Sequence, residues 1–285
     1  MAGARTARPA GAGEGVHTLA VAATVHEQRT GTAAWLDHHL AAGTKVFYKV
    51  RPDDGRDWLT GPDGPPRASA ALASGQLEVM DLAEVVRAAG GTTEGLRRLQ
   101  ESEVDRGLDE GWPRIAMSQE SAGRPMMDAA EVAEYAAQES AYDELARRAP
   151  VITRCQLTAA FENRTASWET ASLHCGGIVD GQWRARWVHG RWELDGEIDV
   201  HVAACFGAAL HGALRLRFDG PGDPDLHVDA SRVAFFDVAG AQSLLLAAHT
   251  AARNQTVVVH GAGRHLQDLV AAVGLPRTLR FESTP

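Results

Sequence analysis

Few residues could carry out chemistry, and the histidines and cysteines among them are not spaced as the ligands of a metal site usually are. His201 and Cys205 stand four positions apart, so on a helix they would share one face, as paired zinc ligands do. Two ligands do not make a zinc site, and a small helix face with a buried cysteine is the simpler interpretation. His38 and His39 are adjacent, so their side chains would leave a helix in different directions. The sequence therefore predicts no metal site.

A phosphate-binding loop is also missing. No stretch matches GxxxxGK[ST], the loop whose backbone N–H groups and lysine hold nucleotide phosphates. Gly261 and Gly263 form a glycine-rich turn, but the third glycine of a dinucleotide-binding loop is absent and Arg264 follows. A loop before a helix explains this turn better. We therefore expect no cofactor and no enzymatic activity.

Carboxylates gather in a helix predicted to begin at Asp128 and to end at Arg148. The group comprises Glu131, Glu134 and Glu139, with Gln138 beside the last. Such a group imitates a carboxylate cluster, but its members alternate with alanine and no histidine stands at ligand spacing. We interpret it as a solvated helix face.

Tryptophans and arginines alternate in part near the start of the second half. They are Trp183, Trp187 and Trp192 with Arg184, Arg186 and Arg191. In a basic protein this pattern would suggest base stacking, but the formal net charge is -9, which argues against unaided binding to nucleic acid. Strand alternation is the better interpretation, with aromatic side chains packed inward and arginines facing water.

Length and composition predict two ordinary domains. The chain has 285 residues, of which 45% are hydrophobic. Its three cysteines show no CxxC spacing, so a disulfide framework is not expected and a reducing cytoplasm is the natural setting. Residues 1–14 are rich in Ala, Gly and Arg and are expected to form a disordered tail. No stretch approaches the roughly 18 apolar residues of a membrane span.

Strand-like and helical runs alternate over the first part of the chain. Predicted strands cover 16–25, 45–50, 76–80, 113–118 and 151–157, and predicted helices cover 27–42, a run through 96–108 capped by Thr92 or Thr93, 128–148 and 163–174. Prolines, aspartates and glycines make 51–67 a surface loop. This order predicts an open, largely parallel sheet with helices on both faces.

In the second part, a buried strand runs directly into a helix within 226–252. The pattern changes at Asp237, whose carboxylate is placed to cap the helix, and Gly240 lets another backbone approach the helix start closely. An Ala-rich helical run covers about 200–214 and follows another strand.

These stretches resemble the STAS domain, the fold of anti-sigma factor antagonists. In that family one strand ends in Leu-x-Gly-Glu-Ile/Leu-Asp, which 194–199 matches in full and which contains Glu197 and Asp199. A later strand of the family ends in Asp-Ser-Ser/Thr-Gly, whose second hydroxyl residue a partner kinase phosphorylates. Here the segment reads Asp237, Val238, Ala239, Gly240, followed by Ala241. The resemblance implies a partner-binding surface at 237–241 with Glu197 and Asp199, and no phosphorylation at the usual position, Ala239.

The first part resembles the MEDS sensory domain, a relative of the RecA-like fold that lacks the phosphate loop. The likeness rests on His17, 40–43, 73–78, Cys155 with Gln156, and His174. It implies a sensory role in which His17, Cys155 and His174 line a ligand pocket.

Together these observations predict two α/β domains, a P-loop-less RecA-like sensory domain at 15–177 and a STAS domain at 183–285, joined by a linker at 178–182. The implied function is partner switching, in which the STAS domain competes with a sigma factor for an anti-sigma factor of the serine-kinase type or contacts another regulatory protein. In the alternative, the first domain binds a small molecule and the STAS domain only relays its state.

Overall fold

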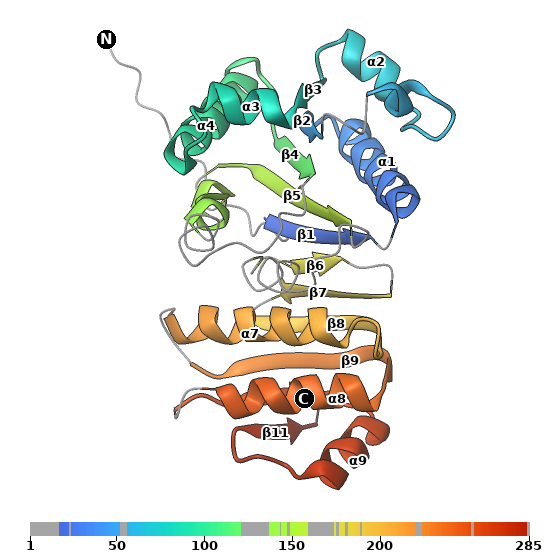
Figure 1. Cartoon of the computed structure of the whole chain (residues 1–285), viewed down its shortest axis with the longest axis vertical. Coiled ribbons are helices and arrows are strands. Elements are labelled where there is room, and N and C mark those ends of the chain that lie inside the picture. Colours follow the sequence, from blue (N-terminus) through green and yellow to red (C-terminus); the bar gives the residue numbers. More distant parts are fainter. Residues whose placement is uncertain are drawn as a thin grey trace.

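One sheet of eleven strands runs through the part of the chain that the structure describes (Figure 1). The computed structural model describes residues 17–22, 24–51, 56–120, 137–142, 144–146, 149–158, 174, 177–179, 182–188, 190–219, 224–251 and 254–283. The predicted tail at 1–14 and most of the predicted helices at 128–148 and 163–174 lie outside these residues. The strand order is β11-β10-β9-β8-β7-β6-β1-β5-β4-β2-β3.

The upper unit of Figure 1 has a fully parallel sheet, as predicted. Its strands are β1 (His17–Ala22), β2 (Lys45–Val50), β3 (Leu77–Asp81), β4 (Ile115–Glu120), β5 (Val151–Thr158) and β6 (Gly177–Val179). Its helices are α1 (Val25–Ala41), η2 (Asp57–Thr60), α2 (Ala68–Ala73), α3 (Leu82–Ala88) and α4 (Thr93–Asp109). Thr24 caps α1 and Thr92 caps α4 through their side chains. Apart from η2, α2, α3 and β6, the strands and helices described here follow one another in the order predicted from the sequence.

Three short helices were not predicted from the sequence, namely η2, α2 and α3. The segment 51–67, predicted to be a surface loop, contains the 3-10 helix η2, whose Leu59 is buried in the core beside α1. Helix α3 was not predicted from the sequence, although its cap is a standard one: Asp81 accepts hydrogen bonds from the N–H groups of Ala83 and Glu84. With only one or two buried side chains, each of these helices has too weak a pattern to be identified from the sequence.

Helices cover both faces of this part of the sheet, as predicted. All six residues of β2 are buried, as in a strand packed on both sides. Tyr48 faces a core with Leu36 of α1 and Ala71 of α2, whereas its neighbour Phe47 faces a second core with Val104 of α4. Successive strand residues point to opposite faces, so the two cores lie on opposite sides of the sheet.

The lower unit consists of β7 (Trp183–Val188), β8 (Arg191–Ile198), α7 (Ala203–Asp219), β9 (Leu226–Phe236), α8 (Val238–Thr250), β10 (Val257–His260), α9 (Arg264–Val273) and β11 (Leu279–Glu282). Strands β8 to β11 are parallel to one another, and β7 is antiparallel to β8. In Figure 1 helices α7 and α8 lie in front of the strands. The fold is the α/β arrangement expected from the sequence.

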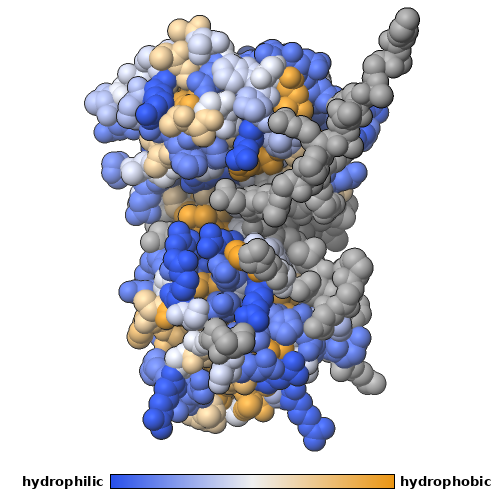
Figure 2. Space-filling model, turned by 180° about the vertical axis from the view of Figure 1, so that it is seen from behind, coloured by the Kyte–Doolittle hydropathy of each residue, from blue (hydrophilic) through white to orange (hydrophobic). Residues whose placement is uncertain are grey.

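The alternation of tryptophan and arginine has the predicted structural cause. Trp183 and Trp192 point toward the helices and pack around Phe206 of α7, while Arg184 and Arg186 are exposed on the other side of the sheet. There Arg184 pairs with Asp195 at 2.5 Å. Figure 2, seen from behind, shows this side of the lower unit as largely hydrophilic.

The two units share the sheet through β6. This strand pairs in parallel with β1 and antiparallel with β7, so backbone hydrogen bonds continue from one unit to the other. Ile178 and Val179, placed by the sequence in a linker at 178–182, therefore belong to a strand. A run of three residues is too short to be recognised from its pattern. In the described residues, no helix is long and apolar enough to cross a membrane.

Candidate functional site

The first candidate site forms where β1 and β5 lie side by side. In their parallel register Leu19 faces Cys155, and His17 stands two residues before Leu19, so both side chains emerge on the same face. The Nε2 atom of His17 lies 3.5 Å from the Cys155 sulfur. Both residues are fully buried. Parallel pairing thus brings together two residues 138 positions apart.

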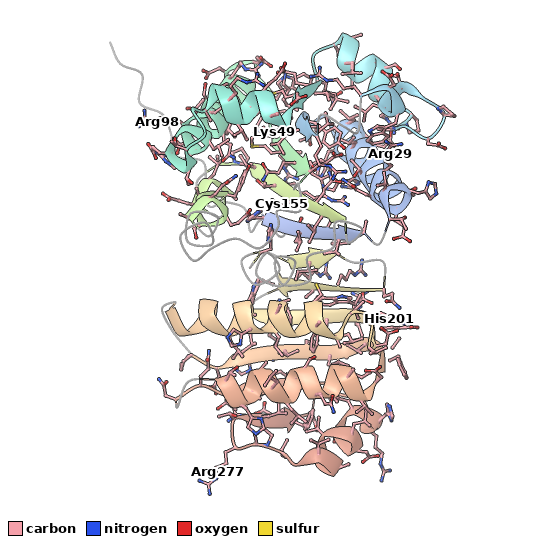
Figure 3. All side chains as sticks on the ribbon, viewed as in Figure 1. Arg29, Lys49, Arg98, Cys155, His201 and Arg277 are labelled. Atoms are coloured by element: carbon pink, nitrogen blue, oxygen red, sulfur yellow. The ribbon has the colours of Figure 1, made fainter. Side chains whose placement is uncertain are left out.

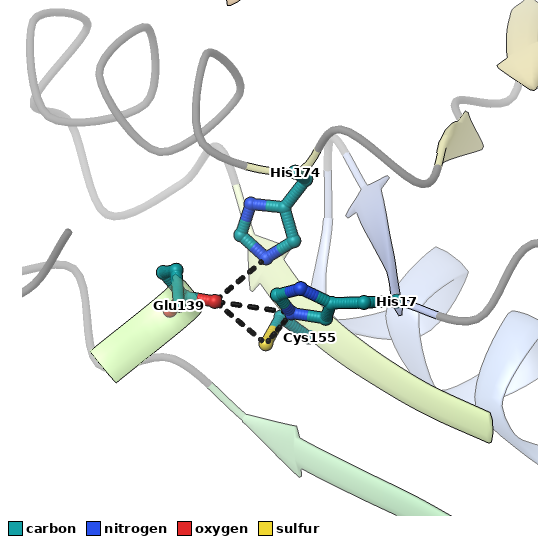
Figure 4. A group of neighbouring side chains, drawn as sticks. All are labelled: His17, Glu139, Cys155 and His174. Carbon is teal, nitrogen blue, oxygen red and sulfur yellow. Dashed lines mark hydrogen bonds and ion pairs between the residues drawn. The ribbon is translucent and has the colours of Figure 1, made fainter. Parts of the chain in front are cut away.

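Two more side chains complete the cluster, which we call the His-Glu-Cys-His cluster: His17, Glu139, Cys155 and His174 (Figure 4). Glu139 belongs to the helical segment 137–142, and its Oε2 atom lies 3.0 Å from His17 Nε2 and 3.3 Å from His174 Nε2. The same oxygen accepts a hydrogen bond from the Cys155 thiol at 3.7 Å. One carboxylate oxygen therefore contacts all three partners.

Polar groups continue beyond the cluster. Gln119 donates to the Cys155 sulfur at 3.7 Å, and its amide oxygen accepts from the Tyr142 hydroxyl at 2.6 Å. Burial, followed by the nearby Glu139 carboxylate, raises the pKa of Cys155 to about 11. Burial also raises the pKa of Tyr142 well above its usual value. Both groups are therefore neutral at physiological pH when nothing is bound.

The position of Glu139 corrects the interpretation of its helix. We expected a solvated face of Glu131, Glu134, Gln138 and Glu139, but the Glu139 residue is 0% exposed. Glu131 and Glu134 lie outside the described residues. No histidine stands at ligand spacing within the helix, and the histidine partners of Glu139 come instead from β1 and from residue 174.

The three residues of the expected ligand pocket are thus brought together, and Glu139 joins them. Their types are those that hold transition metals, and one ligand atom from each of the four lies within 4.8 Å of every other. His201 and Cys205 take no part: His201 is exposed in a turn before α7, and Cys205 is half-buried within that helix. Figure 3 places Cys155 in the upper unit and His201 in the lower one.

The second candidate site is the start of α8. Asp237 caps this helix as predicted: its Oδ1 atom accepts from the Gly240 N–H and its Oδ2 atom from the Val200 N–H, each at 2.8 Å. The close approach at Gly240 is also found. A Cβ added there would lie 2.9 Å from the Ile198 carbonyl oxygen, so the end of β8 leaves no room for a side chain.

The expected partner-binding residues differ in exposure. Val238 and Glu197 are exposed, and Ala239 and Asp199 are half-buried. Gly240 and Ala241 are buried. Asp199 accepts a hydrogen bond from the N–H of His201 at 2.9 Å, which fixes the turn leading to α7.

Three exposed apolar residues are linked to Asp237: Phe235 stands two residues before it, Val238 follows it directly, and the Val200 N–H donates to its carboxylate. Val200, Phe235 and Val238 are 64%, 46% and 52% exposed. We call these three residues the α8-start patch. Phe235 also lines a hollow of about 90 Å³. That volume is below the roughly 300–1,000 Å³ of small-molecule sites, so the surface suits a protein better than a small ligand.

Comparison with known proteins identifies both units. Residues 16–163 match the family described as MEDS, the methanogen/methylotroph, DcmR sensory domain, and residues 185–280 match the family described as Mlab, STAS domain. The sensory match includes His17, Glu139 and Cys155, whereas His174 lies between the two matches. No curated protein matches the chain. Because the sensory match covers more than half of the chain, the chain belongs to the MEDS sensory-domain family, and a STAS domain follows its sensory domain.

Proposed function

We propose that the chain acts by partner switching: its STAS domain binds an anti-sigma factor of the serine-kinase type in competition with a sigma factor, and its MEDS domain supplies the sensory input. The two families are sensory and regulatory, which supports a role in signalling. In this proposal the units extend over 15–177 and 183–285, and the protein contributes to the regulation of transcription in the cytoplasm.

The observation that carries this proposal is the α8-start patch. Val200 and Val238 flank Asp237, whose carboxylate binds the Val200 N–H and caps the helix that Val238 begins. When a partner covers such exposed apolar side chains, their removal from water stabilises the complex. The hydrogen bonds hold the two valines in place before binding, which reduces the conformational entropy lost on association.

The missing hydroxyl changes how such a contact is controlled. Val238 and Ala239 offer no oxygen that accepts a phosphoryl group, so phosphorylation at this position is unavailable. The backbone hydrogen bonds from β1 through β6 to β7 connect the sensory unit to the STAS unit. In our proposal, the state of the sensory unit takes the place of the phosphate as the control.

Affinity capture tests the proposal with matched variants. The full chain, immobilised, is exposed to native cytosol beside Val238→Asp and Leu275→Asp. Leu275 is 54% exposed, similar to Val238, and lies beyond α9, so it controls for loss of an exposed apolar side chain. We expect an anti-sigma factor of the kinase type to be retained by the parent chain and by Leu275→Asp, and to be lost with Val238→Asp. Retention by all three chains, or capture of an unrelated protein alone, would contradict the proposal.

The His-Glu-Cys-His cluster favours a second candidate function, a small-molecule sensor whose STAS domain only relays the ligand state. His17, Cys155 and His174 are the proposed ligand-contacting residues, and the structure brings their side chains together in the sensory unit. Native mass spectrometry of the gently purified full chain tests this function. An organic molecule retained in stoichiometric amount supports it, and a protein mass without any bound organic molecule argues for the first proposal.

A further inference from the structure

The geometry of the His-Glu-Cys-His cluster points to a metal centre. We propose that His17, Glu139, Cys155 and His174 together bind one divalent transition-metal ion, with Zn²⁺ as the ion that fits best. This proposal goes beyond partner switching, because a STAS contact at α8 is independent of it.

The distances between the ligand atoms match a tetrahedral site. Zinc bonds of about 2.0–2.1 Å to nitrogen and oxygen and about 2.3 Å to sulfur place nitrogen and oxygen ligands about 3.3 Å apart and sulfur about 3.5 Å from them. In the cluster, the carboxylate oxygen lies 3.0 Å and 3.3 Å from the two imidazole nitrogens. The sulfur lies 3.5 Å from His17 Nε2 and 3.7 Å from Glu139 Oε2. Four of the six pairs of ligand atoms thus stand close to the separations that a central ion requires, and the other two pairs lie within 4.8 Å.

The charges of the cluster balance with a divalent ion. A Cys155 thiolate and a Glu139 carboxylate contribute one negative charge each, and the two imidazoles bind metals in their neutral form. An M²⁺ ion brings the sum to zero. Each of the four residues is at most 3% exposed, and a buried site without net charge avoids most of the cost of desolvation. On binding, the sulfur–metal bond replaces the S–H bond and the proton leaves to solvent.

The ligand types select the class of ion. A thiolate and two imidazoles favour zinc and similar borderline metals, whereas magnesium and calcium prefer sites built of oxygen atoms. Four protein ligands fill a tetrahedron, which is typical of structural rather than catalytic zinc sites. The ion would join β1, β5 and the helical segment 137–142 to His174, which precedes β6. Binding is therefore expected to stabilise the region where the two units meet.

The competing interpretation is a metal-free cluster held by the same hydrogen bonds. Metal loading of the full chain distinguishes the two. The chain is treated with a chelator, reloaded with Zn²⁺ or Co²⁺, and analysed for bound metal by elemental mass spectrometry. We expect one ion per chain, a thiolate-to-cobalt charge-transfer band in the Co²⁺ form, and a higher melting temperature with Zn²⁺ than without it. A folded chain that takes up neither metal would overturn the proposal.

Cysteine variants assign the site. Loss of a residue that hydrogen-bonds to a metal ligand weakens metal binding about 10–100-fold. Cys155→Ala removes a ligand itself, so it should weaken Zn²⁺ binding by at least about 100-fold and abolish the charge-transfer band. The double variant Cys175→Ala/Cys205→Ala leaves Cys155 as the remaining one of three cysteines, and it should keep both the ion and the band. This double variant decides the matter even if Cys155→Ala does not fold. Loss of the band in the double variant, or unchanged binding in Cys155→Ala, would place the metal elsewhere.

Discussion

The carboxylate of Asp237 accepts a hydrogen bond from the backbone N–H of Val200 at 2.8 Å. With its other oxygen it caps α8. The Asp237 side chain therefore connects the start of α8 to the turn that leads from β8 into α7. The start of α8 and the turn after β8, which both belong to the proposed partner-binding surface, are thereby held in a fixed relation.

Replacement of the cap tests its contribution to stability. Asp237→Ala removes both hydrogen bonds, and the loss of an N-cap side chain costs about 0.5–2 kcal/mol; with the second bond included we expect about 2 kcal/mol. Urea unfolding of the full chain measures the change. Asp268→Ala on the exposed surface of α9 is the control and should alter stability by no more than about 0.5 kcal/mol. Equal stabilities of the two variants would show that the cap is dispensable.

A charge at Ala239 separates fold from contact. A negative charge near a helix N-terminus is favourable by about 0.3–1 kcal/mol, so Ala239→Asp should leave the melting temperature of the protein nearly unchanged. The same charge, desolvated in an interface, should weaken partner binding at least tenfold, or about 1.4 kcal/mol. Calorimetry with the captured partner measures the affinity. Unchanged affinity would move the contact away from this position.

Ser243 should not replace the missing phosphorylation site. It lies one helical turn beyond Ala239, half-buried, where α8 packs on α7: a Cβ added to Gly207 would come within 3.3 Å of its side chain. A kinase needs an accessible hydroxyl, so intact-mass analysis after incubation with the captured kinase and ATP should show no added phosphate. Modification mapped to Ser243 would mean that α7 and α8 separate in solution.

The proposed domain boundary predicts how fragments behave. Most of the core that surrounds Phe206 and Leu244 lies within 183–285, so this fragment should fold alone. Ile178 of β6 contributes to the same core, and β6 covers the edge of β7, so the fragment 177–285 should melt at a higher temperature. Circular dichroism during heating compares the two fragments. An unfolded 183–285 would place the boundary before β6.

The ion pair between Glu78 and Arg106 predicts a pH dependence. The two side chains form paired hydrogen bonds of 2.7 Å, and this guanidinium lowers the pKa of Glu78 from 4.5 to about 2, with a smaller contribution from Lys45. Because the folded pKa lies below the unfolded one, the stabilisation is complete above about pH 4.5 and disappears as the pH falls toward 2. Glu78→Gln should cost about 1 kcal/mol at pH 7, after allowance for solvent screening.

Urea unfolding from pH 7 to 3 provides the measurement. The stabilities of the parent chain and Glu78→Gln should converge as the pH falls, whereas Glu84→Gln on the exposed surface of α3 should stay within about 0.5 kcal/mol of the parent throughout. A difference for Glu78→Gln that does not change with pH would assign its effect to packing.

Local chemistry in the sequence was sufficient to predict most elements. Asp237 could be predicted to cap α8 because the N–H group that it binds lies only three residues further along the chain. Gly240 could be predicted to allow a close approach because it has no side chain. The inward positions of Trp183 and Trp192 follow from the two-residue period of a strand. The alternation of strands and helices predicted the parallel sheet of the upper unit, because a helix between two strands brings the chain back to run in the same direction.

Tertiary structure decided the rest. The spacing of Glu139 indicates that it shares a helix face with its neighbours, but not whether that face meets water or the histidines of distant segments. β6 is a strand because β1 and β7 pair with it, which three residues cannot specify. Within the His-Glu-Cys-His cluster, His17 contacts Cys155, which lies 138 positions away in the chain. Periodicity determines which side chains point together, whereas only the packing of whole elements determines what they meet.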